Sequence, residues 1–188
     1  GTAYMTTVDK SGMGVSLIQS NFYGIGSRIG VGNYGFFLHN RGCGVNLDVN
    51  HPNYLQPGSK PLHTLSPTLW TKDNSLEFII GTRGGRYQPQ LLAQVILPYI
   101  KDGIEFSNIM TQPRWTIDYF QKNRTSKLRF EKIDEEQKTY LESKGHDIEV
   151  IDKMLKGNGP ISTIYKYKDS FHGTADIRVG TESVFSSS

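Results

Sequence analysis

The chain begins GTAYMTTVDKSG, with a threonine at its second position that leads directly into a strand-like run. A hydroxyl is a weak nucleophile at its ordinary pKa and needs a base within reach. The α-amine of a leading threonine titrates at about 7.7–8.0 and supplies that base on the same residue. Here Gly1 precedes Thr2, so that nitrogen is an amide, whether Gly1 is a tag remnant, the end of an uncut precursor or a domain boundary. Thr2 is therefore a candidate nucleophile whose base is released only when the Gly1–Thr2 bond is cut.

Two runs with the alternation of β-strands, residues 2–8 and 13–20, are separated by a short turn. This pattern predicts a β-hairpin. If the residue numbers of facing positions sum to about 21, Thr2 lies opposite Gln19 and Ser20. The first side chain that could do chemistry is thus predicted to lie beside a second hydroxyl.

The elements that would support this hairpin follow it along the chain. Runs of β-branched and aromatic residues indicate buried strands, whereas proline in a first turn and glycine after a last turn indicate helix ends. The order, with helices grouped after position 88, favours a single α+β layered domain over residues 1–188. The expected strands are 75–81, 126–132, 146–152 and 162–168, and the expected helices are 89–103 and 134–145.

The composition and the sequence motifs exclude several classes of protein. The 21 basic and 18 acidic residues give a formal charge of +3, and they form no basic stripe of the kind that nucleic-acid binding requires. The longest apolar run, LLAQVILPYI, is too short to cross a membrane. We expect neither a metal nor a cofactor, because the histidines lack metal-ligand spacing and no dinucleotide motif is present. The single Cys43 leaves the compartment open, with a lean to the cytoplasm.

Five segments form a recognisable series: TAYMTTVDKSGMGVSLIQSNFYGIGS, PLHTLSPTL, GTRGGRYQ, GPISTIYK and TADIRVG. Together they resemble the small subunit of the gamma-glutamyltranspeptidase family over nearly the whole chain. SLIQSN and NRGCG are more similar to the transpeptidase-like or acylase-like branch. The resemblance implies the four-layer αββα sandwich of the N-terminal nucleophile (Ntn) hydrolases. It also implies a precursor that cuts itself before the threonine, which leaves residues 1–188 as a small catalytic subunit bound to a large subunit.

The resemblance assigns catalytic roles by position. Thr2 matches the nucleophile, and Ser20 matches the threonine that hydrogen-bonds the nucleophile, in agreement with the hairpin count. Gly84 and Gly85 match the paired glycines of the oxyanion hole, and backbone donors between a strand and a helix start can face a developing negative charge. The simpler alternatives are an exposed strand threonine, a solvent-facing serine and an ordinary strand-to-helix turn.

The positions that would hold the α-amino group of the substrate fit the family poorly. Phe22 replaces the family asparagine, although Asn21 beside it could substitute. The amide and aspartate positions fall on Arg41 and Gly44, so the family carboxylate is absent. An ammonium that is buried without an anion is strongly unfavourable, and Asp48 is the nearest acid in the sequence that could take over.

The serine pair that binds the substrate carboxylate in the family becomes His63-Thr64. Thr64 keeps a hydroxyl. His63 could donate to a carboxylate, but a neutral loop histidine is the simpler interpretation. Both residues, with Asn21 and Arg41, are candidate substrate-binding residues.

Three classes of function stay open. The first is a gamma-glutamyltransferase-like Ntn hydrolase, in which Thr2 cleaves a γ-glutamyl (glutathione-type) amide through an acyl-enzyme and passes the acyl group to water or to an amino acid or peptide. A variant of this class is an acylase on a glutaryl-like amide, favoured by the arginines at 41 and 83–86. The second class is a catalytically inactive relative. The third is a free-standing β-rich ligand-binding domain that folds without a partner.

Overall fold

The computed structural model describes residues 1–118, 127–151, 154, 159–180, 184 and 186. Within these ranges every helix is too short or too polar to traverse a bilayer. The strands are β1 (Thr2–Val8), β2 (Gly14–Ser20), β3 (Thr68–Lys72), β4 (Ser75–Thr82), β5 (Trp115–Asp118), β6 (Lys127–Phe130), β7 (Asp147–Val150), β8 (Ile161–Tyr167) and β9 (Ser170–Ala175). The helices are α1 (Gln88–Asp102), α2 (Phe106–Ile109) and α3 (Glu135–Ser143).

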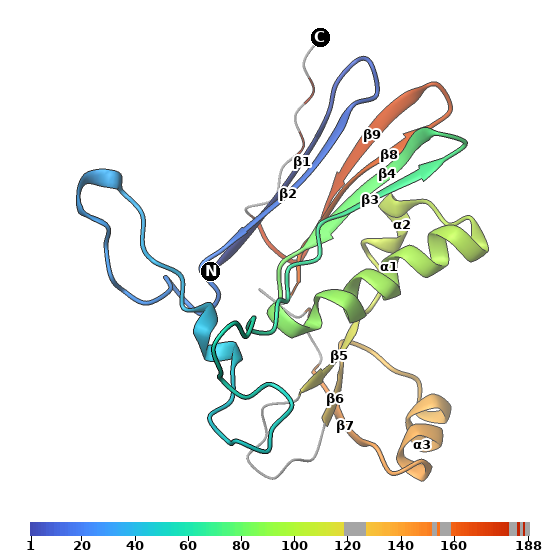
Figure 1. Ribbon diagram of the computed structural model, residues 1–188. Coiled ribbons are helices and arrows are strands. Elements are labelled where there is room, and N and C mark those ends of the chain that lie inside the picture. The colour runs from blue at the N-terminus through green and yellow to red at the C-terminus, as the bar shows by residue number, and fades with distance from the viewer. Residues whose placement is uncertain (119–126, 152–153, 155–158, 181–183, 185, 187–188) are drawn as a thin grey trace.

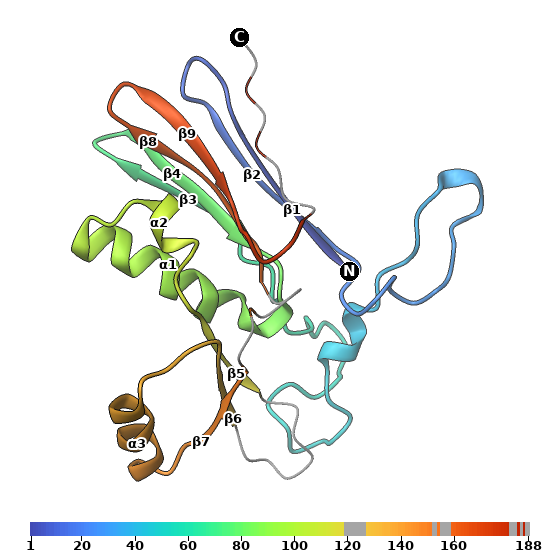
Figure 2. The ribbon, with the colours of Figure 1, turned by 180° about the vertical axis from the view of Figure 1, so that it is seen from behind.

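The described elements stack in layers (Figure 1). The β1–β2 hairpin lies on one face of a sheet with the order β3-β4-β8-β9, and α1 lies on the other face. Seen from behind, the hairpin and the sheet run side by side (Figure 2). A small sheet, β5-β6-β7, lies with α3 beyond the first half of α1. The described residues thus provide two β layers and one α layer of the sandwich expected from the resemblance.

β4 is buried on both faces because it lies between two layers. Phe78 and Ile80 face α1 and belong to the main apolar core, whereas Ile79 and Gly81 face the hairpin. This alternation follows the two-residue period of a strand. The buried core residues are Phe78, Ile80, Leu91, Leu92, Val95, Ile96, Phe106, Ile109, Met110, Ile161 and Tyr165.

Tyr4 fixes the hairpin against the sheet. Its ring lies directly over Gly81, where a Cβ atom would overlap it. The Tyr4 hydroxyl is 2.8 Å from the hydroxyl of Ser16 on β2. Burial raises the pKa of the Tyr4 phenol. The contact holds the strand that begins with Thr2, because Tyr4 projects from the same face of β1 two residues later.

Replacing Gly81 by alanine should lower the free energy of unfolding by about 1–3 kcal/mol, because the Tyr4 ring must leave its place. Urea unfolding of the purified protein measures the change. Gly42→Ala is the matched control, since nothing lies within 4 Å of a Cβ at that position. Equal unfolding midpoints for the two variants would contradict the expectation.

The hairpin is present as predicted, with a small difference in register. Thr2 pairs directly with Ser20, instead of lying between Ser20 and the residue before it. The Asp9 carboxylate explains the difference, because it accepts hydrogen bonds from the N–H and hydroxyl of Ser11 and from the N–H of Met13, which keeps Met13 in the turn. These bonds, with that of the Ser11 hydroxyl first, lower the pKa of Asp9.

Most of the other expected elements are confirmed. The strands expected at 75–81, 126–132, 146–152 and 162–168 are β4, β6, β7 and β8, and the helices expected at 89–103 and 134–145 are α1 and α3. Residues 126 and 152 lie outside the described ranges. β5 and α2 were not predicted; each has only four residues. The closing strand that the resemblance implies at TADIRVG (residues 174–180) is wrong for most of this segment: β9 ends at Ala175, and Asp176 and Arg178 beyond it take part in a buried ion network.

Four charged side chains tie the segment after β9 to the rest of the chain. Asp176 pairs with Arg114 and Arg178, and Arg178 also pairs with Glu131. The side chains of Arg114, Asp176 and Arg178 are at most 2% exposed. Arg114 also donates to the carbonyl of Gly159 over 3.1 Å. Removing one partner from such a buried pair is strongly destabilising, because the other charge stays buried.

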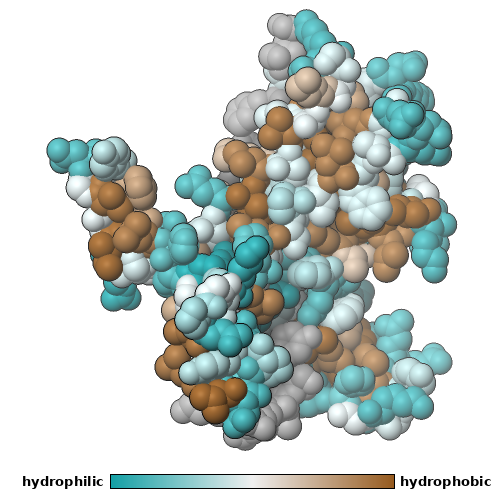
Figure 3. Space-filling model, viewed as in Figure 1, coloured by the Kyte–Doolittle hydropathy of each residue, from teal (hydrophilic) through white to brown (hydrophobic). Residues whose placement is uncertain are grey.

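Residues 21–66 form an arm that leaves the base of the hairpin (Figure 1). The space-filling view shows apolar side chains gathered on its projecting part (Figure 3). Apolar surface of this extent commonly marks an interface. The exposed apolar residues of the arm include Ile25, Ile29, Tyr34, Phe36, Phe37, Leu38, Leu47, Val49 and Leu55.

Candidate active site

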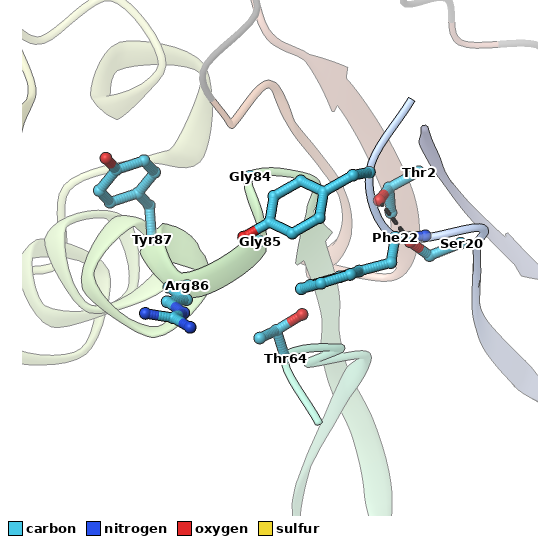
Figure 4. Close-up of a pocket in the computed structure, with 9 residues that line it drawn as sticks. Thr2, Ser20, Phe22, Thr64, Gly84, Gly85, Arg86 and Tyr87 are labelled. Atoms are coloured by element: carbon cyan, nitrogen blue, oxygen red, sulfur yellow. Dashed lines mark hydrogen bonds between the residues drawn. The ribbon is translucent and has the colours of Figure 1, made fainter. Parts of the chain in front are cut away.

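Thr2 lies at the open end of the hairpin, where β1 begins and β2 ends. The pairing of the strands places the Thr2 and Ser20 hydroxyl oxygens 2.8 Å apart (Figure 4). The Phe22 N–H donates to Ser20 Oγ over 3.0 Å, which holds the serine side chain in this position. Two hydroxyls are therefore hydrogen-bonded at the point where a nucleophile was expected.

The peptide bond before Thr2 is held by neighbouring donors. The Gly1 carbonyl oxygen accepts hydrogen bonds from the Asn21 N–H at 3.0 Å and from the Ser20 hydroxyl at 3.3 Å. Donors of this kind stabilise the negative charge that develops on a carbonyl oxygen when its carbon is attacked. The arrangement is chemically suited to attack by the Thr2 hydroxyl on the Gly1 carbonyl.

Gly84 and Gly85 form the turn between β4 and α1. Their φ angles are +136° and +56°, in the region that favours glycine. A Cβ at Gly84 would make only ordinary contacts, 3.4 Å from Leu91 and 3.5 Å from Gly159, so the backbone conformation is what favours glycine there. Among the described residues, neither glycine N–H donates a turn or loop hydrogen bond. No described turn or loop partner therefore competes for these two N–H groups.

One pocket is lined both by the Thr2 and Ser20 hydroxyls and by the Gly84–Gly85 turn (Figure 4). Residues from β1, β2, the arm and the β4–α1 turn meet in it, although they are far apart in the sequence. None of these lining residues, all within the described ranges, is acidic, so the wall is neutral or positive. The lining residues are Thr2, Ser20, Phe22, Tyr23, Thr64, Gly84, Gly85, Arg86 and Tyr87.

Arg41 lies behind this wall and contacts two of its members. The residue is only 8% exposed, and its guanidinium donates to Thr64 Oγ1 over 3.0 Å. The guanidinium carbon is 4.2 Å from the centre of the Phe22 ring. Phe22 has a φ angle of +71°, which is rare for a bulky residue. The cluster of Arg41, Thr64 and Phe22 therefore forms one side of the pocket.

The other two candidate substrate-binding residues do not line this pocket. Asn21 makes backbone contacts: its N–H donates to Gly1, and its carbonyl accepts from the Asn40 N–H at 3.2 Å. His63 is exposed in the loop before Thr64. Roles for Asn21 and His63 in substrate binding stay predictions.

Three aromatic residues of the pocket wall, Phe22, Tyr23 and Tyr87, were not predicted to line it. In the sequence, Phe22 was noted only because it replaces the family asparagine, and no role was predicted for Tyr23 or Tyr87. Their position was the available signal, because Phe22 and Tyr23 follow Ser20 closely and Tyr87 follows Gly85 by two residues. Large side chains near a nucleophile's partner or an oxyanion turn are natural candidates for a pocket wall.

Two curated relatives match most of the chain. The glutathione hydrolase-like YwrD proenzyme of Bacillus subtilis (strain 168) is 32% identical over 179 residues, which are 94% of this chain and 34% of that protein. The oxamate amidohydrolase proenzyme of Klebsiella pneumoniae is 30% identical over 179 residues, with the same shares of 94% and 34%. The chain thus spans about a third of the length of these relatives.

The fold is also shared with solved structures. The crystal structure of cephalosporin acylase from Bacillus halodurans is 29% identical and matches with a TM-score of 0.78, over 93% of this chain and 32% of that chain. Together with the layers described above, this confirms the predicted α+β fold of the Ntn hydrolases. The family model described as Gamma-glutamyltranspeptidase matches residues 1–185. The chain belongs to the gamma-glutamyltranspeptidase family.

Proposed function

We propose that residues 1–188 form a single-domain, catalytic small subunit of a gamma-glutamyltransferase-like enzyme. In the proposed reaction Thr2 cleaves a γ-glutamyl amide of the glutathione type and passes the acyl group to water or to the amine of an amino acid or peptide. The observation that carries the proposal is that the hydroxyl pair of Thr2 and Ser20 shares one pocket with Gly84 and Gly85. The names of the two relatives, a hydrolase and an amidohydrolase, support amide cleavage.

In this mechanism the Thr2 hydroxyl is the nucleophile. Once the preceding peptide bond is cut, the Thr2 α-amine takes the hydroxyl proton, directly or through one water, as Oγ1 attacks the amide carbon. The Ser20 hydroxyl, 2.8 Å away, orients Oγ1. The N–H groups of Gly84 and Gly85 stabilise the charge on the carbonyl oxygen. The proton then moves to the leaving nitrogen, the C–N bond breaks, and an ester on Thr2 remains until water or an acceptor amine attacks it.

The Thr2 and Ser20 hydroxyls, with the Asn21 N–H, also suit the cut that frees Thr2. Attack of the Thr2 hydroxyl on the Gly1 carbonyl gives an ester between the two residues and releases the Thr2 amine, and water then cleaves the ester. The Asn21 N–H and the Ser20 hydroxyl stabilise the charge on the Gly1 oxygen during this attack. Self-cleavage before Thr2 is therefore part of the proposal.

The proposed partner is a large subunit from the same precursor. Both relatives are proenzymes, and this chain matches about a third of each. The outer face of the hairpin is left for a partner to cover, since Met5, Val15 and Leu17 are each about half exposed. The exposed apolar residues of the arm are a second surface that a partner could cover. We expect no stable monomer of this chain alone, because these surfaces need to be buried.

The test starts from the full precursor. N-terminal sequencing and intact mass should show a new end at Thr2, with the two pieces co-eluting as a heterodimer. After incubation with a γ-glutamyl donor and an acid quench, the peptide that begins with Thr2 should carry the acyl mass. An uncut chain that is never acylated would identify an inactive relative. A cooperatively melting monomer of residues 1–188 alone would favour the free-standing domain.

A further inference from the structure

The loop that follows β2 is held by one side chain from the base of the arm, and this contact bears on the cut before Thr2. We propose that Asn40 is a positioning residue for this self-cleavage, an inference that rests on the proposed function. The side-chain amide of Asn40 fixes residues 21–26 in the conformation that brings the Asn21 N–H to the carbonyl before Thr2. Asn40 is not among the residues that line the pocket, so it acts through the loop.

The Asn21 N–H is the donor whose position this loop determines. It donates to the Gly1 carbonyl oxygen over 3.0 Å, a shorter distance than the 3.3 Å from the Ser20 hydroxyl. A hydroxyl can rotate to suit its acceptor, whereas a peptide N–H points where the backbone directs it. The loop backbone must therefore be held in place for this donor to stay aligned with the Gly1 oxygen.

The loop has a backbone conformation that needs support from outside. Phe22, Gly24 and Gly26 have φ angles of +71°, +53° and +88°. A positive φ is unfavourable for a bulky residue such as Phe22. Strained residues of this kind persist only where the surrounding structure fixes them. Contacts from another segment are therefore needed to keep the shape of residues 21–26.

Asn40 supplies this support with four hydrogen bonds to the loop. Its side-chain oxygen accepts from the Tyr23 N–H over 2.9 Å. Its side-chain nitrogen donates to the carbonyls of Tyr23 at 3.2 Å and Gly26 at 3.1 Å. Its backbone N–H donates to the Asn21 carbonyl over 3.2 Å. The amide thus uses both its donor and its acceptor groups on the loop, which fixes the loop and the amide relative to each other.

Asn40 is itself anchored at the base of the arm. Its carbonyl accepts from the Cys43 N–H over 3.0 Å. Nearby, the Leu38 carbonyl accepts from the N–H and the hydroxyl of Ser27, over 2.8 Å and 2.9 Å. A Cβ at Gly26 would overlap the same carbonyl oxygen, so the two sides of the arm are closely packed at this point. The amide therefore joins the loop to a fixed support.

The cut before Thr2 places negative charge on the oxygen that the loop faces. Thr2 Oγ1 adds to the Gly1 carbonyl carbon, and the electron pair of the C=O bond moves to the oxygen. The C–N bond then breaks, the Thr2 nitrogen receives the hydroxyl proton, and water hydrolyses the resulting ester to a Gly1 carboxylate and a free Thr2 hydroxyl. One donor aimed at such an oxygen typically contributes about 100- to 1000-fold to the rate. A misaligned Asn21 N–H would therefore slow the cut.

The acyl transfer that follows should depend less on Asn40. After the cut the carbonyl before Thr2 is gone, and the proposed donors to the substrate oxygen lie in the Gly84–Gly85 turn. Phe22 and Tyr23 of the loop still line the pocket, so loosening the loop should weaken substrate binding more than turnover. One variant should therefore show effects of different size on the two reactions.

The test follows the cleavage of newly synthesised full precursor with time, by intact mass. Asn40→Ala removes three of the four hydrogen bonds and should slow the appearance of the new end at Thr2 by about 10- to 100-fold. In the matured fraction, KM for γ-glutamyl-p-nitroanilide should rise, and kcat should fall by less than about threefold. Asn53→Ala is the matched control, because Asn53 is also partly buried in the arm but donates to the carbonyl of Gly44, outside the loop. This control should be cut at the wild-type rate.

Asn40→Asp keeps the proposal testable if Asn40→Ala fails to fold. It keeps the acceptor for the Tyr23 N–H but loses both side-chain donors, so its cleavage should also be slowed, by about 10-fold or more. Wild-type cleavage in a folded Asn40 variant, or equal slowing in Asn53→Ala, would overturn the inference and leave the proposed function standing. A fall in kcat as large as the fall in cleavage rate would do the same. If the wild-type precursor is never cut before Thr2, the proposed function fails, and this inference fails with it.

Discussion

Replacement of Thr2 by alanine is expected to leave the precursor uncut and to lower kcat by about 10⁴-fold or more. Alanine provides no nucleophile for the Gly1 carbonyl and none for the substrate. Ser20 cannot take over, because its hydroxyl lies on the facing strand and has no amine of its own. The measurements are the mass of the purified chain and the rate of release of p-nitroaniline from an acyl-p-nitroanilide.

Thr2→Ser is the control for this prediction. It keeps the hydroxyl and the amine, and its oxygen can still meet Ser20, so it should be cut and should turn over at a reduced rate. A Thr2→Ala protein that is cut before residue 2, or that still releases p-nitroaniline, would contradict the proposed mechanism. So would a wild-type chain that turns over substrate with Gly1 still attached.

Replacement of Asp176 by asparagine is expected to lower the free energy of unfolding by about 3–5 kcal/mol. The asparagine amide has nearly the same shape as the carboxylate but carries no charge. Among the described members of this network, Glu131 is then the sole carboxylate left beside the two buried cations, Arg114 and Arg178. Burial already lowers the pKa of Arg114, and Asp176 opposes that shift. A loss of this size is a large part of the stability of a typical domain.

Urea unfolding of the mature protein at neutral pH measures this effect. Asp147→Asn is the matched control, since Asp147 is 56% exposed and pairs with Lys127 at the surface, where about 0–1 kcal/mol is expected. Equal unfolding free energies for the two variants would contradict the role of the network.

The hairpin and its hydroxyl pair could be predicted because both depend on local patterns. Strand alternation and a short turn are sufficient to place Thr2 beside Ser20. The remaining difference in register came from the side chain of Asp9, which holds Met13 in the turn through hydrogen bonds. Side-chain bonds of this kind lengthen a turn without changing the polarity pattern of the strands.

The cluster of Arg41, Thr64 and Phe22 could not be predicted in the same way. Its members come from separate parts of the chain with no periodic relation, and only the path of the arm brings them together. The sequence shows that Arg41 differs from the residue expected in the family and that it could bind an anion. Nothing in the sequence indicates that Arg41 is buried behind the pocket wall. β5 and α2 were missed because four residues carry too little periodicity.

The turn at Asp9 lies at the other end of β1 from Thr2, and a seven-residue strand spans about 20 Å. Under the proposed cut, a purification tag fused upstream of Thr2 would be lost with the preceding segment. A tag inserted beside the exposed Lys10 would stay with the chain before and after the cut, at the modest expense of a few turn hydrogen bonds. Precursor and product could then be captured through one handle, and the time course of their conversion followed in a single preparation.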